Sequence, residues 1–270
     1  MMNNKQRHIL SLSGGKDSTA LALYMRDKVP DMEYVFCDTG EELRETYEYL
    51  DQVEAFLGKK IIRLNDRSGF EHWLTVFGGY LPSPRMRWCT KTLKLKPFEK
   101  YVGDNPIVSY VGIRADEDRV GYISGKTNIK TVFPFKEDGI DYEGVMKILH
   151  DSGIGLPPYM EWGRTHSGCY FCFFQQKIEW VRLLEKYPDD FNKAQAFEKL
   201  SDELGKSFTW IEGLPLVKLR EPKNIKKIKA QHKLREAQIR KKRGNRKLVE
   251  ILAGMEEEEY RFRACLICQL

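Results

Sequence analysis

Long apolar stretches are missing from this sequence. No run approaches the roughly 20 residues that a membrane-spanning helix needs. The first apolar stretch, residues 9–12, is too short for the core of a signal peptide and leads directly into a glycine-rich loop. Internal repeats and low-complexity tracts are also lacking, which argues against a solenoid. We therefore expect a cytoplasmic protein that does not associate with membranes.

Cysteine is scarce, with six residues in a chain of 270. In the cytoplasm, a few cysteines are more typical of metal ligands or reactive thiols than of disulfides. Apolar residues, by contrast, make up 41% of the chain, enough for a sizeable core. Charged residues make up 31% and are mixed in sign, which argues against disorder. The composition fits one or two folded domains.

The first 150 residues alternate short β-like runs with helical stretches. Residues 19–27 and 42–57 are expected to be helices, the second because its apolar and aromatic side chains recur at a helical spacing. Strands are expected at residues 7–12, 33–37, 60–64 and 106–111. This alternation predicts an α/β fold, with a parallel sheet and helices on both faces. Ligands of such folds bind at the carboxyl ends of the strands.

The composition changes beyond residue 150, so we expect three segments. An α/β domain covers residues 1–150, a cysteine-containing extension covers 151–215, and a mainly helical basic region covers 216–270 and ends in a C-x-x-C pair. Within the last two segments, helices are expected at residues 178–186 and 223–243.

A glycine-rich loop, Ser-Gly-Gly-Lys-Asp-Ser at residues 13–18, lies between the first expected strand and the first expected helix. Its two glycines allow a tight turn and a close approach of the backbone to a ligand. The amides of residues 15–18 then point outward at a helix N-terminus, where partial positive charge favours phosphate. An ordinary glycine-rich turn is the alternative. The residues assigned to phosphate binding are Ser11, Ser13, Gly14, Gly15, Lys16, Asp17 and Ser18.

Lys16 adds a full positive charge to this loop, and Ser13 and Ser18 add hydroxyl groups. Asp17 cannot itself bind phosphate, so Mg²⁺ is its natural partner. The loop is not a Walker A motif, because an aspartate follows the lysine where that motif requires serine or threonine. The pattern therefore predicts a nucleotide bound through its phosphates together with Mg²⁺.

The loop resembles the PP-loop of ATP pyrophosphatases. Three further strings narrow the resemblance to the phosphoadenylyl-sulfate-reductase-like branch: Phe-Cys-Asp-Thr-Gly-Glu-Glu at 36–42, Arg-Trp-Cys-Thr-Lys-Thr-Leu-Lys at 87–94, and Gly-Ile-Arg-Ala-Asp-Glu-Asp-Arg at 112–119. The resemblance implies a fold of the adenine nucleotide alpha-hydrolase type, with the PP-loop domain in residues 1–150, and ATP or an adenylyl nucleotide as ligand. It places Asp38 and Thr39 near the nucleoside, and Arg114 and Arg119 near phosphates.

The chemistry of the side chains agrees with these placements. Arginine is the usual two-pronged ligand for phosphate oxygens, and Arg114 follows the carboxyl end of an expected strand. The expected catalytic residues are Lys16, Asp17 and Arg114. The alternative for Arg114 and Arg119 is a surface ion pair with the acidic residues 116–118. The alternative for Asp38 is a cap on the helix that follows it.

Cysteine occurs in two C-x-x-C pairs, with one further cysteine standing alone: Cys169 with Cys172, Cys265 with Cys268, and Cys89. This spacing puts two sulfurs on one side of a turn, as iron–sulfur and zinc sites need. We expect these five cysteines to supply a metal centre. A [4Fe–4S] cluster is favoured over zinc because aromatic residues surround the first pair. Incidental or buried cysteines are the alternative.

The resemblance adds a ligand pattern. Iron–sulfur adenylyl-sulfate reductases hold their cluster through an adjacent cysteine pair and a later C-x-x-C. The position of the adjacent pair is Trp88-Cys89 here, so one ligand is missing, and the C-terminal pair could replace it. Five cysteines then compete for four iron positions, which leaves one as a sulfur acceptor. Cys37 is expected in the core, and His166 in a loop hydrogen bond rather than as a ligand.

Positive charge is concentrated in one segment. Residues 223–247 contain twelve Lys or Arg and one acid, a net charge of +11, which leaves −5 for the rest of a chain with a net charge of +6. A polyanion would relieve the self-repulsion, and the absence of aromatic residues predicts contacts to phosphates. A solvated helix is the alternative. The expected nucleic-acid contacts are Lys226, Lys227, Lys229, Lys233, Lys241, Lys242 and Arg243.

Residues 153–157 and 168–180 are similar to the DNA-phosphorothioation sulfurtransferases of the DndC and SspD type. This implies adenylation of a nucleic-acid backbone phosphate, release of pyrophosphate, and sulfur delivered as a persulfide by a cysteine desulfurase. Lys16, Arg114 and Mg²⁺ would stabilise charge on the transferring phosphate.

Three alternatives remain for the function. The first is a sulfonucleotide reductase, although the Glu-Cys-Gly-Leu-His motif of that family is absent. The second is a tRNA thiolation enzyme. The third is a nucleotide-sensing, nucleic-acid-binding module that releases no pyrophosphate.

Overall fold

The computed structural model describes residues 6–118, 126–200 and 207–244, with side chains described as far as residue 238. These residues form two compact units. Unit 1 contains residues 6–73, 88–118 and 126–169, and unit 2 contains residues 74–87, 170–200 and 207–244. The three segments expected from composition remain a prediction. No helix in the described part of the chain is long and apolar enough to cross a membrane.

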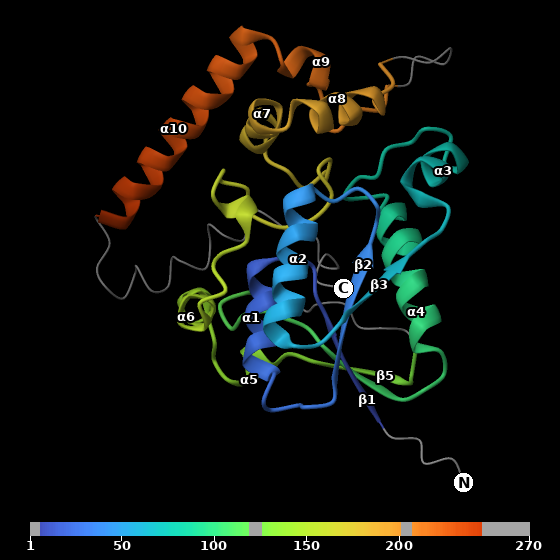
Figure 1. Ribbon diagram of the computed structural model, residues 1–270. Helices are drawn as coiled ribbons and strands as arrows, with labels where there is room; N and C mark the ends of the chain where they lie inside the picture. Colours follow the sequence, from blue (N-terminus) through green and yellow to red (C-terminus); the bar gives the residue numbers. More distant parts are fainter. Residues whose placement is uncertain (1–5, 119–125, 201–206, 245–270) are drawn as a thin grey trace. The chain divides into compact units, whose positions relative to one another are not determined.

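Unit 1 is built on a five-stranded sheet in which every neighbouring pair of strands is parallel (Figure 1). The strand order is β3-β2-β1-β4-β5. The bounds are β1 Arg7–Ser11, β2 Met32–Asp38, β3 Ile61–Asn65, β4 Ile107–Tyr110 and β5 Ile129–Val132. The predicted parallel sheet is therefore confirmed. Sequence reasoning missed β5, whose four residues are only partly buried or exposed and lack a long apolar run.

The helices of unit 1 cover both faces of this sheet, as expected. Alternate residues of β1 point to opposite sides: Leu10 packs with α1, α2 and α6, while Ile9 packs with α4 through Phe98 and Val102. The bounds of these elements and of the shorter ones are α1 Lys16–Met25, α2 Arg44–Leu57, α3 Gly69–Val76, π-helical turn η1 Thr90–Leu95, α4 Lys96–Val102, α5 Pro134–Glu137, α6 Tyr142–Ser152 and the 3₁₀ turn η2 Pro158–Met160.

The strand order reverses direction between β1 and β4. The chain steps from β1 to β2 and β3 on one side, and to β4 and β5 on the other. The loops that leave two such strands diverge and open a crevice at their carboxyl ends, which is the usual ligand position in open parallel sheets. The phosphate loop follows β1, and the string at 112–119 begins just after β4. Two of the recognised motifs therefore leave the strands that flank this switch point.

Unit 2 is mainly helical. Its helices are α7 Lys177–Lys186, α8 Pro188–Ala196, α9 Leu216–Leu219 and α10 Pro222–Gly244, so both helices expected in this part of the chain are present. A capping box between Gln176 and Glu179 starts α7. Aromatic side chains form the core, with the Phe171 and Trp210 rings stacked at a centroid distance of 5.0 Å and the indole of Trp180 fully buried.

Candidate nucleotide site

The phosphate loop connects β1 to α1, and glycine is required at its tightest points. Gly14 has a φ of 69°, and a Cβ atom there would lie 2.9 Å from Cγ2 of Thr46. A Cβ on Gly15 would lie 2.8 Å from Oγ of Ser167. Gly15 is the N-cap of α1 and makes no side-chain capping hydrogen bond. The close neighbours of both glycines explain why a larger residue would displace the loop.

Hydroxyl groups hold the loop in shape. The amide of Ser13 donates to Oγ of Ser18 over 3.2 Å, and that hydroxyl donates in turn to the carbonyl of Gly15 over 3.2 Å. Ser167 donates to Oγ of Ser13 over 3.2 Å. Ser11 is buried, and its hydroxyl has no hydrogen-bond partner within the described residues. Of the predicted serines, Ser13 and Ser18 therefore contact each other, and the hydroxyl of Ser18 holds the backbone of the loop.

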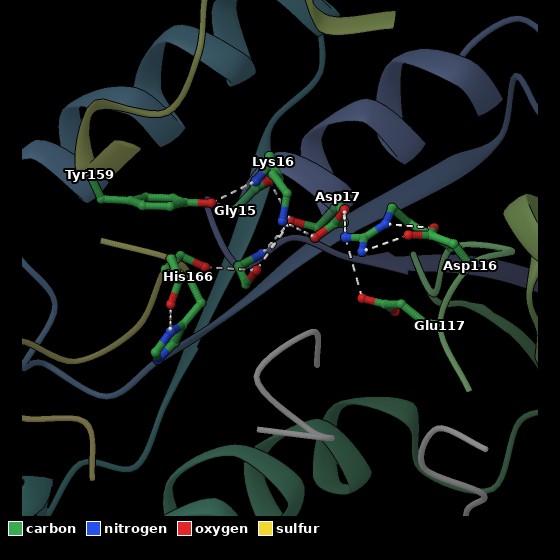
Figure 2. Close-up of polar contacts among 12 residues, drawn as sticks. Gly15, Lys16, Asp17, Asp116, Glu117, Tyr159 and His166 are labelled. Atoms are coloured by element: carbon green, nitrogen blue, oxygen red, sulfur yellow. Dashed lines mark hydrogen bonds and ion pairs between the residues drawn. The ribbon is translucent and has the colours of Figure 1, made fainter. Parts of the chain in front are cut away.

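Asp17 lies between two cations, as Figure 2 shows for Lys16 and Asp17. Its Oδ2 is 3.1 Å from Nζ of Lys16, and its Oδ1 is 3.1 Å from Nη1 of Arg114. Burial alone would raise the pKa of Asp17, but the charges of Lys16 and Arg114 outweigh it and lower the pKa. The loop therefore carries an ionised carboxylate whose two oxygens are both paired.

Arg114 is almost completely buried, with 1% of its surface exposed. Besides Asp17, it donates to both carboxylate oxygens of Asp116, over 2.9 Å from Nε and 3.2 Å from Nη2, and it lies 3.4 Å from Glu117 (Figure 2). Arg114 therefore lies beside the loop, and its contact with phosphates stays a prediction. The ion pairs considered as its alternative are also present, but they are buried rather than at the surface. Arg119 lies outside the described residues.

Three residues at this site escaped sequence reasoning. The amide of Lys16 donates to the hydroxyl of Tyr159 over 3.2 Å, although 143 positions separate the two (Figure 2). The ring of Tyr142 lies 5.6 Å from Nζ of Lys16 and 5.4 Å from Cζ of Arg114, both measured to the ring centroid. Gly112 has little room for a side chain, because a Cβ would lie 3.0 Å from the carbonyl oxygen of Asp17. Only Gly112 sits in a recognised string.

The segment after β2 forms a second polar cluster. The hydroxyl of Thr39 donates to Oε1 of Glu42 over 3.1 Å and lies 3.2 Å from Sγ of Cys169. Asp38 accepts hydrogen bonds from the amide of Gly40 over 2.9 Å and from the hydroxyl of Tyr47 over 2.7 Å. Asp38 does not cap α2, whose N-cap is Leu43. Contact of the two residues with a nucleoside remains a prediction, and the contact between Thr39 and Cys169 was not anticipated.

Comparison with protein families gives a direct match to this part of the chain. Residues 7–150 match the phosphoadenosine phosphosulfate reductase domain. The chain belongs to this family. Its members are generally enzymes, and the matched region contains the phosphate loop and the whole sheet. The chain therefore contains a phosphoadenosine phosphosulfate reductase-like ATP-pyrophosphatase domain, as the resemblance implied.

Three proteins that are similar in sequence are described as uncharacterized. The chain is 29% identical over 243 residues to an uncharacterized protein of Methanocaldococcus jannaschii, covering 83% of this chain and 56% of that protein. It is also 29% identical over 203 residues to a second one, covering 70% and 41%. An uncharacterized 37.8 kDa protein of Escherichia phage 186 is 23% identical over 261 residues, covering 72% and 75%. The chain spans about half the length of the two M. jannaschii relatives.

A solved structure confirms the fold of the reductase-like domain. The crystal structure of phosphoadenylyl-sulfate reductase from Candida auris, a phosphate complex, superposes with a TM-score of 0.50. The superposition covers 60% of this chain and 81% of that one, at 15% sequence identity. At this identity the likeness concerns the fold alone.

The thiols of this reductase-family chain differ in their surroundings. Cys37 is a core residue on β2, as expected, and burial raises its pKa to about 12. Cys89, Cys169 and Cys172 form no disulfide with any described residue, and Cys265 and Cys268 lie outside the described residues. Burial and the nearby charge of Glu42 raise the pKa of Cys169. Within the described residues, no three His, Cys, Asp or Glu side chains gather as metal ligands would. The [4Fe–4S] cluster, and zinc as its alternative, stay predictions.

The basic helix α10 divides into a packed and a solvated part. Ile228 is buried, the helix packs on α7, and Nζ of Lys229 lies 2.6 Å from Glu185. Leu234, in contrast, is 64% exposed. Among the predicted nucleic-acid contacts, Lys226, Lys227 and Lys233 are exposed and make no ion pair with any described residue. Lys241, Lys242 and Arg243 belong to α10, but their side chains lie outside the described set.

Proposed function

We propose that this chain is an ATP pyrophosphatase that adenylates a nucleic-acid backbone phosphate, so that sulfur can replace one of its oxygens. The observation that carries the proposal is the loop between β1 and α1, where Gly14, Gly15 and buried Lys16 meet at the switch point of a parallel sheet. Backbone amides at a helix N-terminus together with a buried cation are the elements of a phosphate site.

The charges around the loop give Mg²⁺ a role. Three carboxylates, those of Asp17, Asp116 and Glu117, surround the two cations Lys16 and Arg114. A polyphosphate entering this site would meet surplus negative charge unless a cation came with it. Carboxylate oxygens are donors that Mg²⁺ prefers, so Asp17 would share the ion with the phosphate oxygens of the nucleotide. In this arrangement Arg114 orients Asp17 as well as binding phosphate.

The chemistry of the proposal balances in two transfers. An oxygen of the acceptor phosphate attacks the α-phosphorus of ATP, and pyrophosphate leaves. A persulfide, delivered by a cysteine desulfurase, then attacks the activated phosphorus through its terminal sulfur, and AMP leaves with the bridging oxygen. A second thiol attacks the inner sulfur of the P–S–S–C bond that results, which releases the phosphorothioate and leaves a disulfide that an external thiol then reduces. Lys16 and the loop amides stabilise the negative charge that develops in the first step. Exclusion of water by the buried loop strengthens these interactions.

Exposed charge on α10 supports a nucleic-acid acceptor. Lys226, Lys227 and Lys233 project from the helix without ion pairs to described residues, so phosphate contacts would cost no existing interaction. DNA is the acceptor we favour.

The family match supports a second candidate, reduction of a sulfonucleotide such as adenylyl sulfate or phosphoadenylyl sulfate. In that case the nucleotide is itself the substrate, and no pyrophosphate is released from ATP. Transfer of sulfur to tRNA is the third candidate, and it shares the first step with the favoured proposal.

The thiols of Cys89 and Cys169, which form no disulfide with described residues, supply the donor type that iron–sulfur clusters use. If the proposed [4Fe–4S] cluster is present, protein purified without oxygen should be brown and contain about four irons per chain. Stoichiometric zinc alone would reject the iron assignment, and neither metal with freely titratable thiols would reject the centre.

The deciding experiment measures pyrophosphate release from ATP and Mg²⁺ with DNA, tRNA or adenylyl sulfate offered separately. We expect release that depends on DNA and disappears in Lys16→Ala. Release that depends on tRNA would move the acceptor to the third candidate. Consumption of adenylyl sulfate with a reductant, and no release from ATP with either nucleic acid, would overturn the proposal in favour of the reductase.

A further inference from the structure

Two stretches of the chain contain no acidic residue, and they meet in unit 2. Aspartate and glutamate number 39 among the 270 residues, but neither occurs at residues 72–98 or 162–178. Both stretches contribute to unit 2. They come into contact where Cζ of Arg87 lies 5.1 Å from the ring centroid of Phe174. This part of unit 2 is therefore built from sequence that supplies positive charge without carboxylates.

Arg87 is a half-buried cation without an anionic partner in the described part of the chain. The ring of Phe174 is its contact there, and it makes no hydrogen bond or ion pair with any described residue. All five N–H groups of its guanidinium are left for water or a ligand. Partial burial removes water from a charge, which is unfavourable unless an acceptor replaces that water. The arrangement favours a negatively charged partner.

Aromatic and apolar side chains lie next to this cation. The rings of Phe173 and Phe174 are 4.4 Å apart between their centroids, and both are half-buried. Met86 precedes Arg87 in the chain and is 47% exposed. Unpaired bases stack on aromatic rings and on guanidinium planes, so an arginine lying over a phenyl ring offers both kinds of platform in one place.

Two further cations flank the pair. Arg85 and Lys177 are exposed, and neither makes a hydrogen bond or an ion pair with a described residue. Arg85 lies in a turn that is closed by two backbone hydrogen bonds of 3.1 Å between Ser83 and Met86. The first acid after Lys177 is Glu179, which is fully buried in the capping box of α7. Both cations are therefore available for phosphate groups.

The name Arg–Phe surface is used for these six residues: Arg85, Met86, Arg87, Phe173, Phe174 and Lys177. We propose that this surface binds a single-stranded stretch of nucleic acid, with one base stacked on the Arg87–Phe174 pair and phosphates held by the flanking cations. An acidic peptide would neutralise the cations but would bring no flat apolar group to the ring. Each nucleotide brings both a charge and a flat face.

The inference rests on the proposed function and deepens it, because it says how the acceptor strand is held. The basic residues 223–247 contain no aromatic side chain, so they offer phosphate contacts only. Bases in a duplex are stacked on one another and are not free to stack on a side chain. The acceptor would therefore be a single strand, or a duplex that is opened locally.

The test measures binding of two single-stranded oligomers to the full chain by fluorescence anisotropy. One is an oligothymidylate, and the other is an abasic oligomer of the same length, which carries the same phosphates but no bases. Phosphate contacts alone would give both oligomers the same affinity. We expect the oligothymidylate to bind about tenfold more tightly, the effect of one stacked base.

Three substitutions separate base contacts from phosphate contacts. Phe174→Leu removes the ring but keeps an apolar side chain, so it should abolish the preference for oligothymidylate and leave the affinity for the abasic oligomer unchanged. Arg87→Lys keeps the charge but loses the guanidinium plane, and it should act in the same way. Arg85→Gln should instead weaken both oligomers by a similar factor and reduce the log–log salt slope by about 0.7, the loss of one phosphate contact.

Phe56→Leu is the matched control. Phe56 is also an exposed phenylalanine beside an arginine, with Cζ of Arg26 5.9 Å from its ring centroid, but Arg26 pairs with Asp27 over 3.4 Å. This variant should keep the full preference for oligothymidylate. Loss of fold would weaken both oligomers together, and melting curves identify it. If Phe174→Leu is unfolded, Arg87→Lys decides.

The outcomes separate the Arg–Phe surface from the proposed function. Equal binding of the two oligomers by the unmodified chain would overturn the surface. A preference that survives in both Phe174→Leu and Arg87→Lys would also overturn it, since the base would then stack elsewhere. DNA-dependent pyrophosphate release would leave the proposed function intact in either case. A preference that both variants lose, without pyrophosphate release in the presence of any nucleic acid, would keep the surface and overturn the proposed function.

Discussion

The phosphate loop and the helix α10 are both rich in charge, but they hold it in different ways. At the loop, Lys16 and Arg114 are buried and paired with carboxylates at 3.1 Å. On α10, Lys226, Lys227 and Lys233 are exposed to solvent. Buried charges require fixed partners because desolvation is costly, whereas solvated charges cost little and are screened by salt. The loop is therefore suited to hold one ligand in one geometry, and α10 to attract many polyanions weakly.

Of the substitutions that test this comparison, Arg114→Ala should have the largest effect on the free energy of unfolding. Arg114→Ala leaves the buried carboxylate of Asp17 with one cation instead of two, so the free energy of unfolding should fall by about 3–5 kcal/mol. Urea denaturation measures it. Arg44→Ala is the control, because Arg44 pairs with Glu48 over 2.7 Å at the exposed surface of α2 and should cost only about 0.5 kcal/mol. Equal losses in both variants would contradict a special role for burial.

Loss of the loop lysine should act on turnover more than on stability. Lys16→Ala and Asp17→Ala are expected to lower pyrophosphate release by about a hundredfold or more, because each removes a charge aimed at the transferring phosphate or its Mg²⁺. Initial rates with the acceptor that supports release give this factor, and melting curves exclude unfolding. Unchanged ATP affinity and unchanged release in both variants would remove the loop from the mechanism.

His166, near the phosphate loop, should make the free energy of unfolding depend on pH. Burial and nearby positive charge lower its pKa from 6.5 to about 3, so between these values the unfolded chain binds a proton that the folded chain does not. The free energy of unfolding should therefore fall as the pH drops below 6.5, by about 2 kcal/mol at pH 5 from this residue alone.

His166→Asn should remove this part of the slope between pH 7 and pH 5. His150→Asn is the comparison, because that side chain is 89% exposed on α6. Chemical denaturation at each pH provides the measurement. A slope that persists undiminished in His166→Asn would show that the imidazole is protonated in the folded chain.

Substitutions of the exposed lysines on α10 should change stability least. Replacing Lys226, Lys227 and Lys233 together by glutamate should lower nucleic-acid affinity by about tenfold or more and reduce the log–log salt slope by about 3 for duplex DNA. Thermal stability should stay nearly the same. Ile228→Ala, which removes a buried side chain from the packed face of α10, should show the opposite pattern. Filter binding over a salt series, beside melting curves, separates a binding surface from a solvated helix.

The chain order of the elements could be predicted because hydrophobic pattern and glycine punctuation are local properties. The strand–loop–helix context of residues 13–18 and the two long helices of unit 2 follow from such signals. Strand β5 lacks such local signals, because it has only four residues and their side chains are partly buried or exposed. Strand β5 is defined by its pairing with β4, which lies about twenty positions earlier in the chain, and local sequence does not reveal such a pairing.

The sequence by itself determined the phosphate loop, because six consecutive residues contain what the loop needs. Gly14 allows the tight turn, and Lys16 and Asp17 supply the charges. Only the tertiary structure decided which distant groups complete the site. Tyr159 reaches the Lys16 amide, Arg114 pairs with Asp17, and Thr39 meets Cys169, across 143, 97 and 130 positions respectively. These contacts arise because parallel strands bring their carboxyl ends to one edge of the sheet, a consequence of the fold that no local pattern encodes.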